Sequence, residues 1–173
     1  MTQKVFGILV LLATFAAPAL AGQMRILEAR VLKVYDVDTV LAEVGFKRAQ
    51  PVRVAGIDGP ERRHRKGRWP EQPWARQATI WARKVLAGRE VRLIVLETDR
   101  YGRLVARVQL LDGTDYGAEA VRLGHAWAFT RYQKIPLYVD LAAYARFKRR
   151  GLWTAPQPVR PGDWRRGAWR RRP

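Results

Sequence analysis

The sequence predicts a single α+β domain built on a small five-stranded β-barrel with three helices. The length of 173 residues suits one domain with short extensions. Hydrophobic residues make up 48% of the chain, which is enough to bury a core. Strand-like and helix-like segments follow one another in the order β-β-β-α-β-β-α-α. Five short strands interrupted by one helix are what a closed or partly closed Greek-key barrel requires.

The N-terminus has the layout of a secretory signal peptide. Lys4 gives it a positive start, an apolar run covers residues 5–17, and an Ala-Leu-Ala sequence at 19–21 has the small residues that precede a cleavage site. The apolar run is shorter than the roughly 20 residues of a transmembrane helix. We expect residues 1–21 to be removed on export, which would leave a periplasmic or secreted protein. An uncleaved membrane anchor is the alternative.

The five strands are predicted from β-branched and alternating segments. Three come first, at 26–34, 39–44 and 51–57. Two more follow the first helix, at 90–97 and 104–111. The connections between them are rich in Asp and Gly, which favour turns.

The three helices are predicted from apolar spacing and from their end residues. The first covers about 73–87, with Gly88 as its C-terminal stop. The second is short, is capped by Asp115 and ends at Gly124. The third is an amphipathic segment at about 137–150. With the strands, these helices complete one predicted domain over residues 22–154.

The tail after this domain, residues 155–173, has a different composition. It contains four Pro, six Arg, two Trp and one Asp, which cannot build a core of its own. The sequence therefore predicts a disordered basic arm. Trp164 and Trp169 lie among arginines, a pattern that suits stacking on unpaired bases and also suits contact with an anionic membrane.

The charge and the missing cysteines narrow the functional classes. Lys and Arg number 33 against 15 Asp and Glu, a formal charge of +18, which indicates a polyanionic partner. Arginine outnumbers lysine, and its planar fork grips phosphate in a bidentate way. The absence of cysteine excludes thiolate metal sites, iron–sulfur clusters and thiol nucleophiles. With two histidines in the chain, a metal would be a hard cation held by oxygen.

Three short polar segments lie at the ends of predicted strands: Asp36-Val37-Asp38-Thr39, Arg53 to Glu61, and Asp99 to Arg103. Each alone is compatible with ordinary turn chemistry. Together they supply carboxylates and guanidinium groups, which phosphodiester hydrolysis requires. A cation and arginines offset charge on the phosphoryl oxygens, and a carboxylate takes a proton from the attacking water.

In order and spacing these segments resemble the thermonuclease, or staphylococcal-nuclease-like, family from about residue 30 to residue 153. The matching strings are the Asp-x-Asp-Thr turn, Arg53…Asp58-x-Pro-Glu61, Asp99-Arg100-Tyr101-Gly102-Arg103, Arg122-x-Gly124-x-Ala126-Trp127 and Gly151-Leu152-Trp153. The resemblance implies an OB-fold barrel with three helices. It also implies a Ca²⁺-dependent endonuclease that cuts DNA and RNA to give 3′-phosphate products. We expect a monomer with no small-molecule cofactor.

The resemblance also implies roles for the acidic residues. Asp38 and Asp58 would hold Ca²⁺, with the backbone carbonyl of Gly59 as a further ligand. Glu61 would act as the general base on the attacking water. These residues make up the implied metal and base sites.

The remaining implied roles are contacts with the nucleic acid. Arg53 and Arg103 would grip the scissile phosphate and stabilise its transition state. Tyr101 and Tyr132 would contact phosphate or base on the groove wall.

A basic run follows Glu61 and contains Arg62, Arg63 and Lys66. We interpret it as an electrostatic guide for a nucleic-acid strand, because backbone-tracking grooves are lined in this way. The alternative is a solvated loop. Neighbouring positive charges would lower the pKa of Glu61 and weaken it as a base, so the cation would have to acidify the water.

Two positions depart from the family pattern. Members usually carry Gly where this chain has Val37, and Thr is common at the position of Gly59. A β-branched residue resists positive φ, so a turn that needs a left-handed residue would displace Asp38 and lower the calcium affinity. Two other functions therefore stay open: a non-catalytic OB module with a degraded metal site that binds nucleic acid, and a cationic envelope protein that binds anionic lipid.

Overall fold

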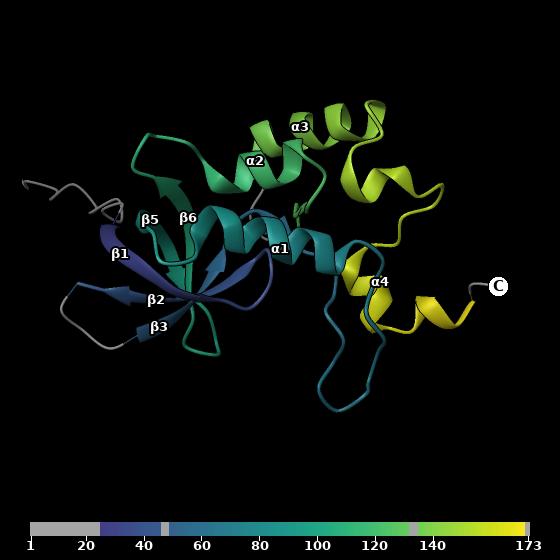
Figure 1. The fold of residues 1–173 in the computed structure, drawn as a ribbon, viewed down its shortest axis with the longest axis horizontal. Helices are drawn as coiled ribbons and strands as arrows, with labels where there is room; N and C mark the ends of the chain where they lie inside the picture. The colour runs from purple at the N-terminus through teal and green to yellow at the C-terminus, as the bar shows by residue number, and fades with distance from the viewer. Residues whose placement is uncertain (1–24, 46–48, 132–134, 172–173) are drawn as a thin grey trace, which may run out of the picture.

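The computed structural model describes residues 25–45, 49–131 and 135–171. A closed barrel is formed by strands in the spatial order β1-β2-β3-β6-β5 (Figure 1). Their bounds are Arg25–Val34 (β1), Thr39–Val44 (β2), Ala49–Val54 (β3), Glu90–Thr98 (β5) and Leu104–Leu110 (β6). Neighbouring strands are antiparallel except β3 and β6, which run parallel. The predicted five-stranded barrel is thus confirmed.

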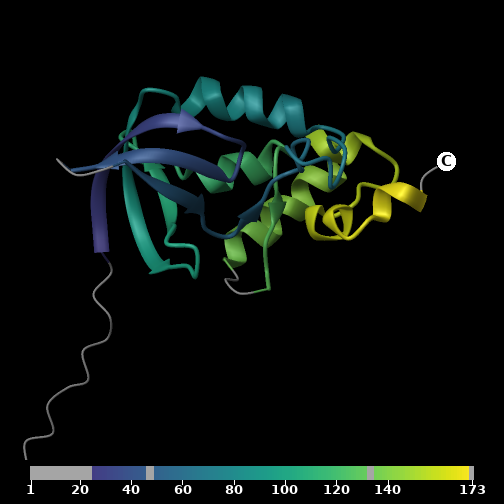
Figure 2. The same cartoon turned by 90° about the horizontal axis from the view of Figure 1, so that it is seen from below.

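Helix α1 (Ala75–Leu86) covers the barrel on the side of β1 (Figure 2). Small and apolar residues on one face, among them Ala78, Ala82 and Leu86, are buried against the core. The helix begins two residues later than the sequence predicted, because Trp74 at its N-cap adopts a left-handed conformation with φ 74°. The predicted face of the helix is nevertheless the one that packs.

Helices α2 (Tyr116–Arg122) and α3 (Pro136–Phe147) pack against each other. Asp115 caps α2 as predicted, by accepting a hydrogen bond from the Ala118 N–H at 3.0 Å. Gly124 ends this segment with φ 73°, and a Cβ there would lie 2.2 Å from the backbone oxygen of Arg150. Only glycine allows that approach, which ties the end of α2 to the 3₁₀ turn η1 (Gly151–Thr154).

A second, two-stranded sheet was not anticipated. The sequence predicted one strand over 51–57, but Gly56 (φ 74°) bends the chain and starts a separate strand, β4 (Ile57–Asp58). Strand β4 pairs antiparallel with β7 (Trp127–Ala128), so that Asp58 lies opposite Trp127. This pairing fixes the backbone that carries Asp58.

The described part of the tail, residues 155–171, differs from the predicted disordered arm. It forms a short helix, α4 (Pro161–Arg165), and a 3₁₀ turn, η2 (Ala168–Arg171), at the end of the molecule away from the barrel (Figures 1 and 2). Trp164 is 4% exposed, and its indole N–H donates to the Pro70 carbonyl at 2.9 Å. The tail has no core of its own, but it buries its tryptophan against the loop that precedes α1.

The predicted signal peptide, residues 1–21, lies outside the described residues. Within the part of the chain that the structure describes, no helix combines the length and apolar character needed to cross a membrane.

Candidate active site

Two buried carboxylates share one guanidinium at the end of the barrel. Arg53 Nη1 lies 3.1 Å from Asp38 Oδ1, and Arg53 Nη2 lies 3.2 Å from Asp58 Oδ1. Both aspartates are 6% exposed. Two residues that the family resemblance assigns to the metal are therefore in direct contact with one that it assigns to the phosphate.

Three neighbouring segments bring these side chains together. Thr39, which follows Asp38, lies opposite Arg53 in the β2–β3 ladder, and its hydroxyl donates to Asp38 Oδ1 at 2.9 Å. The N–H of Gly59 donates to Asp38 Oδ2 at 2.7 Å. The turn before β2 is thereby bonded to the end of β4, and the position of Asp38 is fixed by both.

The acidic residues of this cluster differ in their ionisation. Burial raises the pKa of Asp38, but the charge of Arg53 and the Gly59 N–H outweigh it, so the net shift is downward. Burial and the charge of Asp38 raise the pKa of Asp58 to about 6. The same two causes raise the pKa of Asp36 to about 8. The cluster thus contains more acid than one guanidinium neutralises.

This donor set fits a hard divalent cation. Carboxylate oxygens are the ligands that Ca²⁺ prefers, and Asp38 and Asp58 both direct a carboxylate oxygen at one point, the guanidinium of Arg53. Among the described residues, no group of three or more acidic or histidine side chains is arranged to hold a metal ion. A Ca²⁺ ion at Asp38 and Asp58 would therefore need water and backbone oxygens, such as the Gly59 carbonyl, to reach about six to eight ligands.

Glu61 follows closely on this cluster and is held by contacts that the sequence did not reveal. Its backbone exchanges two hydrogen bonds with Gln72: the Glu61 N–H donates to Gln72 Oε1 at 3.0 Å, and the Gln72 N–H donates to the Glu61 carbonyl at 2.8 Å. Its carboxylate forms an ion pair with Arg165 of α4. Burial raises the pKa of Glu61 to about 7, although the charge of Arg165 opposes the shift. A base with this pKa is well matched to neutral pH.

Arg103 lies in the hairpin between β5 and β6 and is oriented by Asp99. The backbone N–H of Arg103 donates to Asp99 Oδ1 at 3.0 Å, and its guanidinium lies 2.7 Å from Asp99 Oδ2. The guanidinium also lies 5.6 Å from the ring centroid of Tyr101. Arg103, Tyr101 and Arg53 line one cavity of about 490 Å³, which we call the barrel hollow. Both predicted phosphate-binding arginines thus face the same space.

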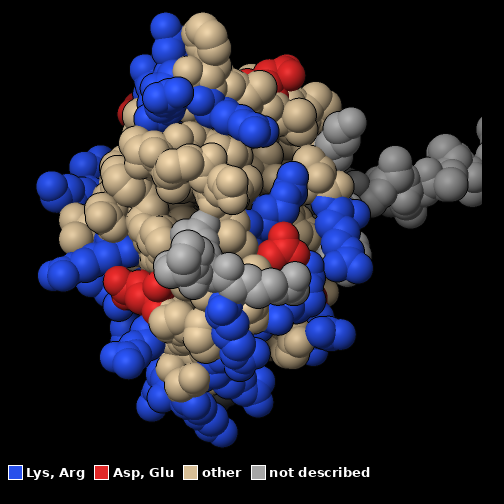
Figure 3. All heavy atoms as spheres, turned by 90° about the vertical axis from the view of Figure 1, so that its right-hand side faces the viewer, with Lys and Arg blue, Asp and Glu red and all other residues tan. Residues whose placement is uncertain are grey.

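The predicted basic guide lies in an exposed loop. Arg62, Arg63 and Lys66 are all exposed, and Arg62 Nε lies 3.4 Å from Glu71 Oε2. Lys and Arg side chains cover much of this end of the molecule, which also carries α4 (Figure 3). Tyr132, the other predicted groove residue, lies outside the described residues.

The two departures from the family pattern fit each other. Val37 has no positive φ, since Trp74 and Arg149 are the non-glycine residues with positive φ in the described chain. Its side chain is 1% exposed, and its Cγ1 lies 2.4 Å from where a Cβ on Gly59 would be. Val37 therefore fills the space that a larger residue at position 59 would need. The turn at Val37 does not use a left-handed residue, and Asp38 contacts Arg53 at 3.1 Å.

Three residues of the site were missed from the sequence: Gln72, Trp164 and Arg165. The one available signal was the pair of tryptophans in an otherwise hydrophilic tail, which indicates an anchor as readily as a stacking platform. No sequence pattern marks Gln72 as a support for Glu61. Its carboxamide bonds to the Glu61 N–H and to the carbonyl of Val159, and the second partner lies 87 residues away in the sequence.

The chain is similar to known proteins over most of its length. The family model described as staphylococcal nuclease homologue matches residues 51–155. The chain belongs to the staphylococcal nuclease family. It is 32% identical over 151 residues to an uncharacterized endonuclease of Escherichia coli O157:H7, covering 87% of this chain and 91% of that protein. An uncharacterized endonuclease of Haemophilus influenzae is 31% identical over 137 residues, 79% of this chain and 72% of the relative.

A plant relative is similar over a smaller part of its length. The probable staphylococcal-like nuclease CAN1 of Oryza sativa subsp. japonica is 31% identical over 115 residues, which are 66% of this chain and 32% of that protein. The resemblance, the OB-type barrel and the nuclease class that the sequence predicted are confirmed at the level of the family.

Proposed function

We propose that this member of the staphylococcal nuclease family is a Ca²⁺-dependent endonuclease that hydrolyses phosphodiester bonds in DNA and RNA. The observation that carries the proposal is the contact of Arg53 with both Asp38 and Asp58, at 3.1 and 3.2 Å. It joins an acidic pair suited to a cation with a guanidinium suited to a phosphate. The relatives, whose names are uncharacterized endonuclease and probable staphylococcal-like nuclease, support the same activity.

In this mechanism the protein positions the reactants and moves one proton. Glu61 takes a proton from a water molecule, whose oxygen then bonds to phosphorus. The bond from phosphorus to the 5′ oxygen breaks, and this oxygen leaves and takes up a proton. The products are a 5′-hydroxyl and a 3′-phosphate. When bound at Asp38 and Asp58, Ca²⁺ supplies positive charge that acidifies water and offsets charge on the phosphoryl oxygens.

Arg53 and Arg103 stabilise the negative charge of the transition state. Their guanidinium groups are oriented by carboxylates, Arg53 by Asp38 and Asp58, and Arg103 by Asp99. Such preorganised donors cost little reorganisation during the reaction. Because these guanidinium groups bind phosphate, which carries no sequence information, we expect low base specificity.

The test is cleavage of DNA and RNA by the purified protein with Ca²⁺ or with a chelator. We expect Ca²⁺-dependent cleavage that falls by roughly a hundredfold or more in Glu61→Gln, since general base catalysis typically contributes 10²–10⁴-fold. Arg103→Ala should give a loss of similar order. Binding without cleavage at any metal concentration would identify a non-catalytic OB module instead, and full activity in Glu61→Gln would disprove the mechanism.

We also propose that the protein is exported, on the basis of the signal-peptide pattern at residues 1–21. Fractionation of expressing cells should recover a processed chain outside the cytoplasm. A full-length chain in the cytoplasmic fraction would contradict export.

A further inference from the structure

A second hollow is lined by Asp58, the ion-pair partner of Arg53. It has a volume of about 270 Å³ and lies between α4 and the segment that follows β7. Asp58 lines it together with four arginines: Arg131, Arg160, Arg165 and Arg166. We call it the tail groove. Three of its four arginines lie beyond residue 155, where the match to the family model ends.

The tail groove adjoins the catalytic centre through Asp58. Asp58 lines the tail groove, and Arg53, at 3.2 Å from Asp58, lines the barrel hollow. The two hollows are therefore joined by one ion pair, and both are lined by arginine. A nucleic-acid strand whose scissile phosphate is held by Arg53 would have a neighbouring phosphodiester within reach of the tail groove.

The arginines of the tail groove are accessible to a ligand. Arg160, Arg165 and Arg166 are exposed, and the side chain of Arg166 is 70% exposed. The guanidinium of Arg160 lies 5.6 Å from the ring centroid of Trp127. Arg166 pairs with Asp163. The groove thus has more guanidinium groups than carboxylates, which favours an anionic ligand that can accept several charge-assisted hydrogen bonds.

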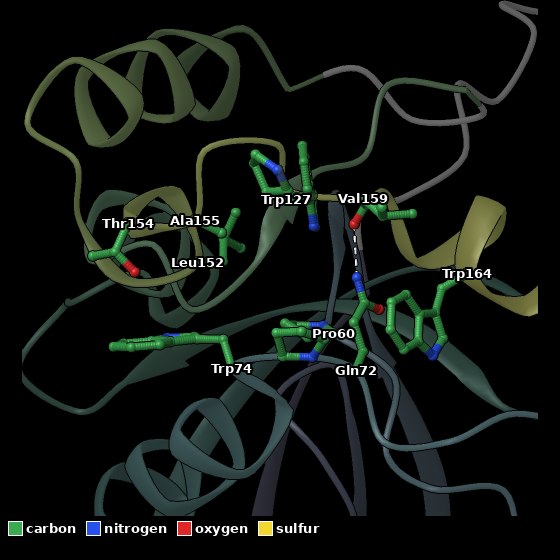
Figure 4. Close-up of a pocket in the computed structure, with 11 residues that line it drawn as sticks. Pro60, Gln72, Trp74, Trp127, Leu152, Thr154, Ala155, Val159 and Trp164 are labelled. Carbon is green, nitrogen blue, oxygen red and sulfur yellow. Dashed lines mark hydrogen bonds between the residues drawn. The ribbon is translucent and has the colours of Figure 1, made fainter. Parts of the chain in front are cut away.

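Contacts on the inner side of the tail keep this surface in place. Gln72 donates from Nε2 to the Val159 carbonyl at 2.6 Å, with the indole of Trp164 beside it (Figure 4). A small cavity of about 50 Å³ remains between these groups and is lined mainly by Pro and Trp residues. It is too small and too apolar for a nucleotide, so this side of the tail is an anchor. The groove on its other side carries the charge.

We propose that the tail groove is a second backbone-binding subsite, which holds a phosphodiester next to the scissile one. This inference rests on the proposed nuclease function and names the part of the substrate that the C-terminal segment contacts. Phosphate contacts of this kind position a strand and strengthen binding without reading its bases. They also make binding depend on salt.

The test compares Arg160→Ala/Arg166→Ala with the matched pair Arg83→Ala/Arg89→Ala, two exposed arginines at the other end of α1. Cleavage of a tetranucleotide and a dodecanucleotide is measured with Ca²⁺. In the wild type the longer substrate should have the lower KM. The tail-groove variant should raise the KM for the dodecanucleotide about tenfold, since loss of about 1.4 kcal/mol is a tenfold change. In the Arg83→Ala/Arg89→Ala control, the KM for the dodecanucleotide should stay within about twofold of the wild-type value.

Two further measurements separate charge from structure. Arg160→Lys/Arg166→Lys retains the charge and should give an intermediate KM, because lysine lacks the bidentate fork. Limited proteolysis of the alanine variant should show the tail still protected. An unchanged KM for the dodecanucleotide, or an equal rise in the matched pair, would overturn the proposal.

The proposed function and this inference can fail separately. If the wild type cleaves nothing, the nuclease proposal fails, and the affinity of each variant for the uncleaved dodecanucleotide in chelator still tests the groove. Vesicles containing phosphatidylglycerol test whether the groove binds an anionic lipid surface instead of nucleic acid. If the alanine variant loses vesicle binding and keeps its affinity for the dodecanucleotide, the groove binds lipid and the proposal is wrong.

Discussion

The barrel hollow and the tail groove are both lined by arginines, and each contains one member of the Arg53–Asp58 ion pair, but different contacts hold them in place. In the barrel hollow, Arg103 is held by Asp99, four residues earlier in the same hairpin. In the tail groove, Arg165 pairs with Glu61, which is 104 residues away in sequence. One hollow is held by local turn contacts on barrel strands, whereas the other depends on a short helix docked by Trp164.

The difference shows how the family site can be extended. All residues that line the barrel hollow lie within the family match at residues 51–155, and none of them belongs to the tail. The tail groove adds positive charge without altering the strands. We therefore expect substitutions in the barrel site to affect both stability and catalysis, and substitutions of Arg160 and Arg166 in the tail to affect mainly the affinity for long substrates.

The largest effect should come from Arg53→Met, because Arg53 contacts both carboxylates at the boundary of the two hollows. Removing one partner from a buried ionic cluster leaves uncompensated charge and costs about 3 kcal/mol of unfolding free energy. Urea denaturation measures the loss. The control Arg92→Met, at an exposed barrel position, should stay within about 0.5 kcal/mol. Equal losses in the two variants would contradict the central role of Arg53.

A smaller loss is expected for Gly59→Ala, since its Cβ would lie 2.4 Å from Val37 Cγ1. Overpacking of this kind costs about 2 kcal/mol. Val37→Ala removes the opposing methyl groups, so the double variant should be more stable than the sum of the single losses by about 1 kcal/mol. Thermal or urea unfolding of the four proteins gives this coupling. Simple additivity would show that the two positions do not compete for space.

The buried acidic cluster should make the free energy of unfolding depend on pH. The pKa of Asp36 is raised from 3.8 to about 8, chiefly by burial. Between these values the folded protein keeps a proton that the unfolded chain has lost, so the free energy of unfolding should fall as pH rises. The slope is at most about 1.4 kcal/mol per pH unit for one group.

Urea unfolding in chelator across this pH range tests the slope, and Asp36→Asn should flatten it. A wild-type stability that increases with pH over the same range would contradict the assignment.

The smallest effect on global stability is expected for Trp164→Ala, which removes the anchor of the tail. The midpoint of thermal unfolding should shift by only a few degrees, about 1 kcal/mol. Local opening should become much more frequent, so protease cleavage within residues 155–171 should accelerate about tenfold or more. A loss of stability as large as that of Arg53→Met would show that the tail and the barrel are one cooperative unit.

The parts of the structure that could be predicted from the sequence are those with local causes. Strand segments, the Asp115 cap and the Asp99–Arg103 hairpin each follow from residues close together in the chain. The β4–β7 pair was missed because two-residue strands leave no periodic signal. The docking of the tail was missed because the partner of Trp164 lies 94 residues earlier. A Pro- and Arg-rich composition is the same whether such a segment is free or docked.

The hydrogen bonds from Gln72 to Val159 and from Trp164 to Pro70 have a consequence for the order of folding. They join segments 87 and 94 residues apart, whereas the barrel closes between β1 and β5 over 60 to 70 residues and between β3 and β6 over 52 residues. Contacts between distant segments carry the larger loop-closure cost and form late. In refolding, we expect tryptic protection of the barrel to return before protection of α4. An early population of molecules should then have a complete barrel hollow and an incomplete tail groove.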